Sequence, residues 1–448
     1  MQTIFEPGKN IPVIEEADLC VLGGSCTGVF AAVRAARLGA KVVIVEKQNC
    51  FGGVATSGLV NIWHSLYDTE FKQRIIGGLT AEVIERLEKR AAVQNTTNSP
   101  SSAFNLNTEE LKIELDTLLT ESKVKPLLHS FYVAPYLEEG RLEAVIIENK
   151  SGRGAIKAKV FIDATGDGDL CYQLGMDHYT TQGLQPPTTC AKIYLGEQLQ
   201  SFDYRKALSK QGSEFGLRED WGWRTFVPGL PNTFMHAETH VFGANCAIAT
   251  QLTDSEIEGR RQVRAFMDLM RKYGPQDTIS LAALPSTIGI RETRHIKARY
   301  RLTENDILTG VRFPDAIANG SYPVDVHHQN SSGITFKYLD GTQAVIDHRS
   351  SGTKRGRWRE ESESNPTFYQ LPYRALVPHE FDNVLLCGRM LDAEAGAFGA
   401  IRVMVNLNQV GEAAGVAAYL ALDGALPVGD VSSELLRKNL AKGGSIII

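Results

Sequence analysis

The amino-acid sequence predicts an α/β protein in which a Rossmann-like domain, assembled from discontinuous segments, carries an inserted α+β lobe. Two observations lead to this fold class. A strand, a glycine turn, a helix and a second strand follow one another near the start of the chain, and a comparable buried strand with an Ala-rich helix returns only after residue 370. The 448 residues, 43% hydrophobic and 22% charged, have an ordinary globular composition that suffices for more than one core.

The first unit covers residues 17–45. Residues 17–22 and 42–45 are short apolar runs, and residues 29–38 between them carry Ala and Val at helical spacing after a glycine-bearing turn. A right-handed crossover of this kind places its two strands parallel in one sheet. Glu46 is therefore expected at the carboxyl end of the second strand.

The next segments alternate between loop, helix and strands. Residues 95–107, rich in Asn, Ser and Thr, predict an exposed loop, and the leucine spacing in residues 108–122 predicts a helix. Three runs separated by glycine turns then predict a meander that ends at Asp163: residues 131–136, 142–148 and 155–162.

A Gly- and Pro-containing break at residues 182–187 predicts the passage into another lobe. The chain is thereby divided into three parts. Residues 1–185 are the first part of a nucleotide-binding domain, residues 186–369 are an inserted substrate or cap lobe, and residues 370–448 are the C-terminal part of the first domain. In the lobe, Thr253 with Glu256 predicts a capping box, and Asp340-Gly341 predicts a hairpin turn. The last part predicts a strand at 384–386 and a helix at 411–422.

Charge, hydropathy and cysteine spacing exclude several classes of protein. The formal charge is only −5, from 47 basic and 52 acidic residues, so we expect no nucleic-acid partner. No apolar run approaches the roughly 18 residues of a membrane-spanning helix, and no secretory signal is visible. Seven widely spaced cysteines without a C-x-x-C pair predict a reducing, cytoplasmic location, no iron–sulfur cluster and no redox dithiol.

The glycine turn carries the first chemical signal. Its residues, Gly23, Gly24, Ser25, Cys26, Thr27 and Gly28, fit G-x-G-x-x-G at the first and third glycines, with Ser25 in the middle place. A glycine turn without a ligand would look the same in isolation. Here the turn follows a strand and opens a helix, and an acid at Glu46 suits the ribose hydroxyls. The sequence therefore predicts a dinucleotide site.

Further motifs make the chain resemble the FAD-dependent oxidoreductases of the glutathione-reductase-like superfamily, the flavoproteins with two dinucleotide-binding domains. Residues 52–59 (G-G-V-A-T-S-G-L) and 161–169 (F-I-D-A-T-G-D-G-D) are similar to family stretches that run along the nucleotide. Further similar segments are residues 291–294 (R-E-T-R), 371–374 (L-P-Y-R), 386–389 (L-C-G-R), 401–404 (I-R-V-M) and 411–415 (G-E-A-A-G). In relatives the final element brings a helix amino terminus toward the flavin pyrimidine edge.

The resemblance implies an FAD-binding domain with FAD held noncovalently, because residues 47–57 contain no histidine of the kind that attaches flavin in some relatives. It disfavours direct oxidation of NAD(P)H, since no second glycine-rich turn appears between Gly168 and Val384. The implied cofactor-binding residues are Gly23, Gly24, Ser25, Cys26, Thr27, Gly28, Glu46, Lys47, Gly52, Gly53, Thr56, Ser57, Val133, Ala164, Thr165, Gly166, Gly388, Arg389, Arg402, Val403 and Met404.

Two positions depart from the family pattern. Ser25 replaces the middle glycine and adds a side chain beside the phosphates, which we expect to lower affinity for FAD. Glu412 stands where relatives often carry Gln, and an anion near the flavin O2 edge would disfavour the anionic reduced cofactor. Arg402 and the helix amino terminus are expected to stabilise that same negative charge, although Arg402 in a surface salt bridge is an equal alternative.

The proton-accepting residue is sought in the inserted lobe. On a strand, His236, Glu238 and His240 would share one face, and His240 is the favoured base, with Tyr373 as the next candidate. A solvated strand face explains the same pattern, and no metal site is expected because the spacing differs from H-E-x-x-H. The pair His327-His328 is expected to be structural, and Arg291 with Arg294 suits either a substrate carboxylate or core ion pairs. These last assignments therefore stay open.

The resulting interpretation is a flavoprotein oxidoreductase in which hydride passes between a small organic substrate and flavin N5. A hydroxylated substrate is the first choice, and an electron acceptor is an expected but unidentified partner. The alternatives are an FAD-binding subunit with a structural or sensing role and an enzyme like the flavin hydroxylases. The hydroxylase is disfavoured because such enzymes carry Gly-Asp where this chain has Gly388-Arg389.

Overall fold

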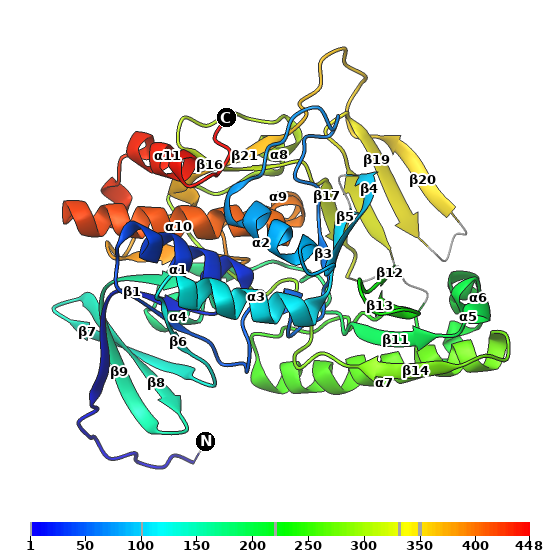
Figure 1. The fold of residues 1–448 in the computed structure, drawn as a ribbon, viewed down its shortest axis with the longest axis horizontal. Helices are drawn as coiled ribbons and strands as arrows, with labels where there is room; N and C mark the ends of the chain where they lie inside the picture. Colours follow the sequence, from blue (N-terminus) through cyan, green and yellow to red (C-terminus); the bar gives the residue numbers. More distant parts are fainter. Residues whose placement is uncertain (1, 100–101, 219–221, 330–332, 348–351) are drawn as a thin grey trace.

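The computed structural model describes residues 2–99, 102–218, 222–329, 333–347 and 352–448 (Figure 1). The helices are α1 (Cys26–Leu38), α2 (Gly78–Glu88), α3 (Thr108–Glu121), α4 (Asp169–Gln173), α5 (Glu197–Gln200), α6 (Tyr204–Gln211), α7 (Ala249–Tyr273), α8 (Glu304–Leu308), α9 (Ala395–Ile401), α10 (Met404–Gly424) and α11 (Ser433–Lys442). The strands are β1 (Val13–Leu22), β2 (Val42–Val45), β3 (Ile62–Trp63), β4 (Val93–Ser99), β5 (Ser102–Leu106), β6 (Lys125–Leu127), β7 (Phe131–Glu138), β8 (Arg141–Asn149), β9 (Gly152–Asp163), β10 (His178–Thr180), β11 (Ala191–Leu195), β12 (Trp223–Phe226), β13 (Thr233–Ala237), β14 (Ile279–Ala283), β15 (Arg294–Ile296), β16 (Ala316–Gly320), β17 (Val324–His327), β18 (Ile334–Lys337), β19 (Thr342–Asp347), β20 (Gly352–Arg357), β21 (Tyr369–Pro372) and β22 (Val384–Leu386).

A parallel sheet forms the centre of the fold, as the strand, turn, helix, strand pattern predicts. The strand order is β6-β2-β1-β9. Strand β22 pairs with the carboxyl-terminal part of β9, on the edge opposite β1. Leu22 of β1 and Leu386 of β22 are both in register with Asp163 of β9. The two parts of the chain that the sequence assigns to one domain therefore meet in a single sheet.

Helices α1, α3 and α10 cover one face of this sheet (Figure 1). The axes of α1 and α10 approach closely because α10 presents glycine to α1. A Cβ atom on Gly411 would lie 2.1 Å from the carbonyl oxygen of Thr27, and one on Gly415 would lie 2.1 Å from that of Ala31. This close packing places the amino terminus of α10 at the same edge of the sheet as the amino terminus of α1.

The meander predicted for β7, β8 and β9 is confirmed as an antiparallel unit. Strand β9 belongs to both sheets: its first half pairs with β8, and its second half pairs with β1 and β22. The predicted hairpin at Asp340-Gly341 joins β18 to β19 and is likewise confirmed. These regions were readable from the sequence because turn residues separate runs of regular alternation.

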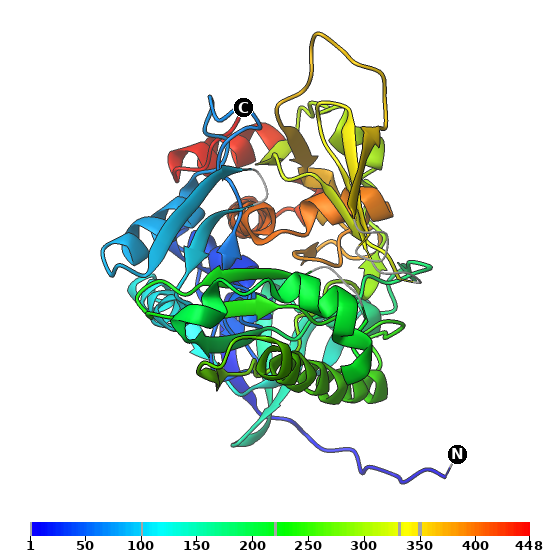
Figure 2. The same ribbon diagram turned by 90° about the vertical axis from the view of Figure 1, so that its right-hand side faces the viewer.

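The middle of the chain adds two further sheets. The sheet β12-β13-β11-β14 packs on α7 and has its own apolar core, whereas the sheet β17-β18-β19-β20 lies on the other side of α9 and α10 (Figure 2). Residues from Ile296 to Val324 share the apolar core of the parallel sheet. The domain boundaries at 185 and 369 stay a prediction, but the apolar core does not stop at them.

Three local predictions differ from the structure. Residues 95–107 do not form a loop, since β4 and β5 pair there as an antiparallel hairpin whose residues 100–101 lie outside the described part. Helix α7 begins at Ala249, so Thr253 is inside it and its hydroxyl donates to the carbonyl of Ala249 at 2.9 Å instead of capping. Helix α10 begins earlier than residue 411, at Met404.

Among the residues that the structure describes, no helix combines the length and the apolar character needed to cross a membrane.

Candidate functional site

A cavity of about 800 Å³ opens at the carboxyl ends of the parallel strands. Leu22, Val45, Ala164 and Gly388, which end or directly follow β1, β2, β9 and β22, all line it. In open parallel sheets this edge, at the point where the strand order reverses, is where ligands bind. The cavity continues from there to the two added sheets.

The glycine turn closes one end of the cavity. Gly23 has a φ of +102°, and a Cβ atom there would lie 2.2 Å from the carbonyl oxygen of Ala164. A Cβ atom on Gly28 would lie 2.0 Å from the carbonyl oxygen of Gly23, so both positions require glycine. Ser25 has a φ of −62°, and its hydroxyl accepts from the amide of Gly28 at 3.4 Å. The serine therefore caps α1, and the turn does not need glycine at its middle place.

Glu46 holds this turn against the loop that follows β2. Its Oε2 accepts from the amide of Gly24 at 2.7 Å, and its Oε1 accepts from the amide of Gln48 at 2.8 Å. The residue is buried and lines the cavity. The carboxylate is therefore fixed in place at the cavity wall, where a ribose hydroxyl could donate to it.

The opposite wall is formed by residues 164–169 and by Arg389. The Arg389 guanidinium forms an ion pair with Asp167, whose Oδ1 also accepts from the hydroxyl of Thr293 at 2.7 Å. Burial opposes ionisation of Asp167, but Arg389, the hydrogen bond from Thr293 and Lys47 together lower the pKa of this carboxyl. Arg294 donates to Asp169 at 3.2 Å and also lines the cavity, so its assignment to an ion pair or to a substrate carboxylate stays open. The wall is thus held by paired charges.

A polar cluster lies at the far end of the cavity, beside the amino terminus of α10. Arg402 precedes that helix, and its Nη2 is 3.0 Å from Oδ2 of Asp325 in β17. The hydroxyl of Tyr322 donates to the same oxygen at 2.8 Å, and Nε2 of His327 is 3.5 Å from Oδ1. These four side chains all line the cavity. We call Tyr322, Asp325, His327 and Arg402 the polar cluster.

The histidines at this end of the cavity are neutral at pH 7. Burial lowers the pKa of His64, which packs against the Tyr322 ring at 4.2 Å between centroids, to about 3. Burial and the neighbouring Arg291 hold the pKa of His327 well below its usual range. Both rings are consequently available as hydrogen-bonding groups without charge.

Most of the residues predicted to bind the cofactor do line the cavity. The exceptions are Gly24, Gly28, Thr56 and Val133. Gly24 and Gly28 are part of the glycine turn but do not line the cavity. The Thr56 hydroxyl donates to the carbonyl of Phe51 at 2.6 Å, within the loop that follows β2. Phe131 and Tyr132 line the wall where Val133 was expected. That these residues bind FAD stays a prediction. What they share in the structure is a position around one cavity.

Two of the predicted proton acceptors lie away from the cavity. Strand β13 ends at Ala237, which lines the cavity, so the alternation of the strand turns His236 to the opposite face. There His236 packs between Tyr204 and Phe266, and burial lowers its pKa to about 3. The Tyr373 hydroxyl donates to the carbonyl of Val428 at 2.5 Å in the core. Neither is placed to meet a ligand in the cavity.

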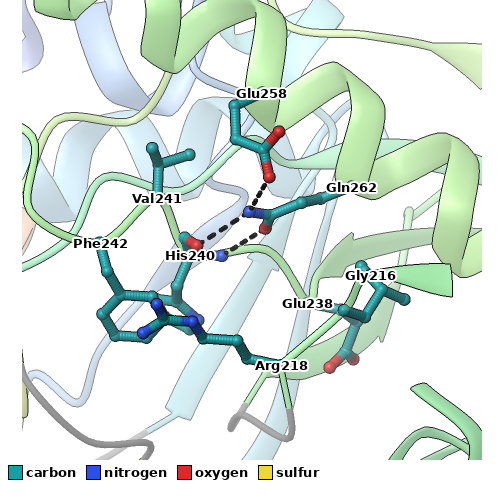
Figure 3. Close-up of a pocket in the computed structure, with 9 residues that line it drawn as sticks. Gly216, Arg218, Glu238, His240, Val241, Phe242, Glu258 and Gln262 are labelled. Carbon is teal, nitrogen blue, oxygen red and sulfur yellow. Dashed lines mark hydrogen bonds between the residues drawn. The ribbon is translucent and has the colours of Figure 1, made fainter. Parts of the chain in front are cut away.

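His240 does not line the large cavity. It follows β13 and lines a separate hollow of about 170 Å³, where its backbone exchanges two hydrogen bonds of 3.0 Å with the side-chain amide of Gln262 (Figure 3). Its ring centroid is 5.2 Å from that of His327. His327, which the sequence analysis expected to be structural, does line the large cavity, as His64 does.

The sequence left the orientation of Glu412 open, and the structure places it away from the cavity. Its Oε1 accepts from the amide of Leu79 at the start of α2, and its Oε2 is 3.5 Å from Nε of Arg34. It is fully buried and does not line the cavity. The anion at this position therefore does not face a cofactor, and burial raises its pKa to about 7.

The polar cluster was missed by the sequence although a weak signal is present. In residues 322–327 (Y-P-V-D-V-H), Asp325 and His327 alternate with two valines, a period of two that predicts one shared face on a strand. Arg291 also lines the cavity, held by hydrogen bonds of 2.5 Å to the carbonyl of Pro186 and the hydroxyl of Thr188. In the described ranges, no group of three or more His, Cys, Asp or Glu side chains is arranged to hold a metal ion.

Comparison with known proteins settles the family. The model of the family described as FAD dependent oxidoreductase matches residues 18–440. The chain belongs to this family. FAD is accordingly its cofactor, and the fold is an α/β fold with a Rossmann-like FAD-binding domain.

More distant likenesses accompany the family match. A segment of 107 residues is 31% identical to the mitochondrial dihydrolipoyl dehydrogenase of Schizosaccharomyces pombe, which is 21% of this chain and 21% of that relative. Among solved structures, a geranylgeranyl bacteriochlorophyll reductase-like protein of Thermoplasma acidophilum is similar at 11% identity and a TM-score of 0.47, over 96% of this chain and 83% of that one. The myxobacterial chondrochloren halogenase is similar at 14% identity and a TM-score of 0.44, over 96% and 80%.

The residues around the cavity fit FAD. Cys26 and Thr27, in the first turn of α1, line the cavity where backbone amides suit a diphosphate. The carboxylate of Glu46 is buried at the same wall, in the place for ribose hydroxyls. Val403 and Met404, at the amino terminus of α10, line the other end, where a ring that gains negative charge on reduction is stabilised.

Proposed function

We propose that this flavoprotein oxidises a small, hydroxylated organic substrate at the polar cluster, and that it is a member of the glutathione-reductase-like branch with noncovalent FAD. When bound, FAD supplies the acceptor of the substrate hydride, at flavin N5. The observation that carries the proposal is the continuity of one cavity from the glycine turn to the polar cluster. A structural or sensing subunit would need no such cluster at the far end.

The amino terminus of α10 and Arg402 provide positive potential at that end of the cavity. Arg402 is mostly buried, and its contact with Asp325 fixes the guanidinium beside Val403 and Met404. Fixed donors of this kind stabilise negative charge that develops during a reaction, because they need not reorient. We therefore assign charge stabilisation to Arg402.

The inserted lobe supplies the space for the substrate. Thr188 and Cys190 line the cavity from the segment before β11. Trp223 and Ala237 line it from β12 and β13. Apolar side chains of this wall exclude water, while the polar cluster orients a hydroxyl group across from it. A small organic molecule with an apolar body and a hydroxyl group fits both walls.

The first test identifies the substrate with the FAD-loaded protein. Denatured protein should release intact FAD, and anaerobic mixing with a panel of alcohols, sugars, amines and acids should bleach the flavin for at least one alcohol or sugar. Bleaching by amines alone, or by no member of the panel, would contradict the proposal.

The second test concerns Arg402. Arg402→Gln should slow anaerobic flavin reduction by roughly 10²–10³-fold, the usual cost of removing one preorganised donor, with FAD content unchanged. Arg299→Gln is the matched control, since Arg299 is exposed and donates to the carbonyl of Gly429 outside the cavity. A parent-like reduction rate in Arg402→Gln would remove Arg402 from the reaction.

A further inference from the structure

Asp325 is the acidic member of the polar cluster, and only one of its two carboxylate oxygens forms hydrogen bonds in the described part of the chain. It is 4% exposed and lines the cavity from β17. Its Oδ2 accepts from both Arg402 and Tyr322, at 3.0 Å and 2.8 Å. Its Oδ1 is buried and accepts no hydrogen bond from the residues that the structure describes. The two oxygens of this carboxylate therefore differ in what they can still bind.

Burying a carboxylate oxygen without a hydrogen-bond donor destabilises the folded protein, because the oxygen loses its hydrogen bonds to water and forms none with the protein. Within the cluster, Nε2 of His327 is 3.5 Å from Oδ1, beyond the range of a good hydrogen bond. Arg402 and Tyr322 both bond Oδ2, so the carboxylate cannot rotate without breaking these two contacts. This geometry favours a ligand that brings a donor to Oδ1.

We propose that Asp325 Oδ1 accepts the hydrogen bond of the substrate hydroxyl and takes its proton, so that the substrate is an alcohol with a hydrogen on its carbinol carbon. This assignment rests on the proposed function. The substrate O–H bond breaks with its proton going to Oδ1, the C–H bond breaks with the hydrogen leaving as hydride together with both bonding electrons, and the second C–O bond forms. FAD, when bound, would accept the hydride, so that the proton on Oδ1 and the hydride account for the two hydrogens and two electrons that the alcohol loses.

The neighbours of Asp325 suit this role. Tyr322 and Arg402 both donate hydrogen bonds to Oδ2 and thereby fix the plane of the carboxylate. Oδ1 is therefore held in position to accept a hydrogen bond, and the side chain loses no further freedom when a donor binds. His327 is two residues along the same strand and is neutral, so it offers no competing positive charge to Oδ1. Ile334 and Phe336 of the paired strand β18 line the cavity beside them and keep the site apolar around the hydroxyl.

The test uses two probes that the oxidised holoenzyme cannot convert. 1-Methylcyclohexanol is a tertiary alcohol without a carbinol hydrogen and can donate to Oδ1, whereas cyclohexanone can only accept. We expect the unaltered enzyme to bind the alcohol about tenfold or more tightly than the ketone, measured by calorimetry or by the shift of the flavin spectrum. Equal binding, or tighter binding of the ketone, would overturn the proposal without any variant.

Asp325→Asn tests the atom itself. The amide oxygen can keep the contacts of Oδ2, which turns an N–H group toward the cavity in place of Oδ1. The preference for the alcohol should therefore disappear, because the hydroxyl oxygen and the ketone oxygen can both accept from that N–H group, and substrate-driven flavin reduction should fall by about 10²–10⁴-fold. Asp315→Asn is the matched control, since Asp315 pairs with Arg374 outside the cavity, and it should leave the probe preference unchanged.

The probe measurement separates this proposal from the proposed function. An alcohol preference that Asp325→Asn abolishes supports the assignment of Oδ1 even if the substrate panel yields no bleaching. Bleaching by an alcohol with a parent-like rate in Asp325→Asn keeps the oxidation and overturns the role of Asp325. A control variant that changes the preference as much as Asp325→Asn does would also overturn it.

Discussion

At the scale of single residues, the glycine turn shows how one side chain can organise a binding site. Glu46 receives two backbone amides, one from the turn and one from the loop that follows β2. Both segments line the cavity, so the same carboxylate that suits the ribose also fixes the walls around it. Loss of this residue affects binding through a direct contact and through the shape of the turn.

Glu46→Ala should weaken FAD binding by about 1.5–3 kcal/mol, the range for hydrogen bonds to a charged acceptor. This corresponds to a dissociation constant raised by roughly 10-fold to 150-fold. Titration of the apoprotein with FAD, followed by flavin fluorescence, measures it. Glu148→Ala, at an exposed position of β8, should leave the constant unchanged, and equal affinities of Glu46→Ala and the parent would show that Glu46 is not the ribose ligand.

Most residues that the sequence predicted to bind the cofactor line the cavity, whereas the polar cluster was not predicted. Gly23, Glu46 and Gly166 belong to short sequence motifs that can be recognised locally, although their contacts in the structure join distant segments, as the hydrogen bond from Gly24 to Glu46 does. His236 failed as a cavity residue because the predicted strand face depends on which side of β13 packs on α7, a long-range fact. The polar cluster combines segments far apart in the chain, so no local spacing marks it.

At the scale of elements, the contact between α1 and α10 determines where the amino terminus of α10 lies. Gly411 and Gly415 let the two helices approach to the distance of backbone contact. The sequence predicted a helix in this region, but an Ala-rich pattern alone does not tell which helix it packs against. Its start at Met404 was missed, because the helix was predicted from the Ala-rich stretch, which begins only at Gly411.

Gly411→Ala should destabilise the protein by about 1–3 kcal/mol, since the added methyl group meets a backbone carbonyl that cannot move aside. Gly424→Ala in the same helix is the matched control. Its Cβ atom would meet only the flexible side chain of Leu426, so a change between zero and a gain of about 1 kcal/mol is expected from helix propensity. Urea denaturation of both variants measures the difference, and equal stabilities would refute the close-packing argument.

At the scale of the whole molecule, Glu412 connects the parallel-sheet domain to the segments around it. Its carboxyl group accepts from α2, and it lies beside Arg34, which donates to the carbonyls of Leu440 and Gly443 in and after α11. Burial raises the pKa of Glu412 from 4.5 to about 7. The folded protein therefore holds a proton that the unfolded chain has released between these two pH values.

The stability should accordingly fall as pH rises from about 4.5 to about 7, by roughly 3 kcal/mol from this group. Glu412→Gln removes the titration and should flatten that part of the pH profile, measured as the free energy of unfolding at pH 5, 6 and 7. Glu434→Gln, on the exposed face of α11, should retain the parent slope. A slope in Glu412→Gln identical to that of the parent would show that another group titrates.

The pairing of β22 with β9, and of α10 with α1, also has a consequence for biosynthesis. The glycine turn is synthesised early, whereas the strand at 384–386 and the helix from Met404 follow much later along the chain. Until these segments have been synthesised, the carboxyl end of β9 lacks its partner β22, and the cavity lacks the amino terminus of α10. We therefore expect the complete FAD site to form only after residues 384–424 have emerged from the ribosome.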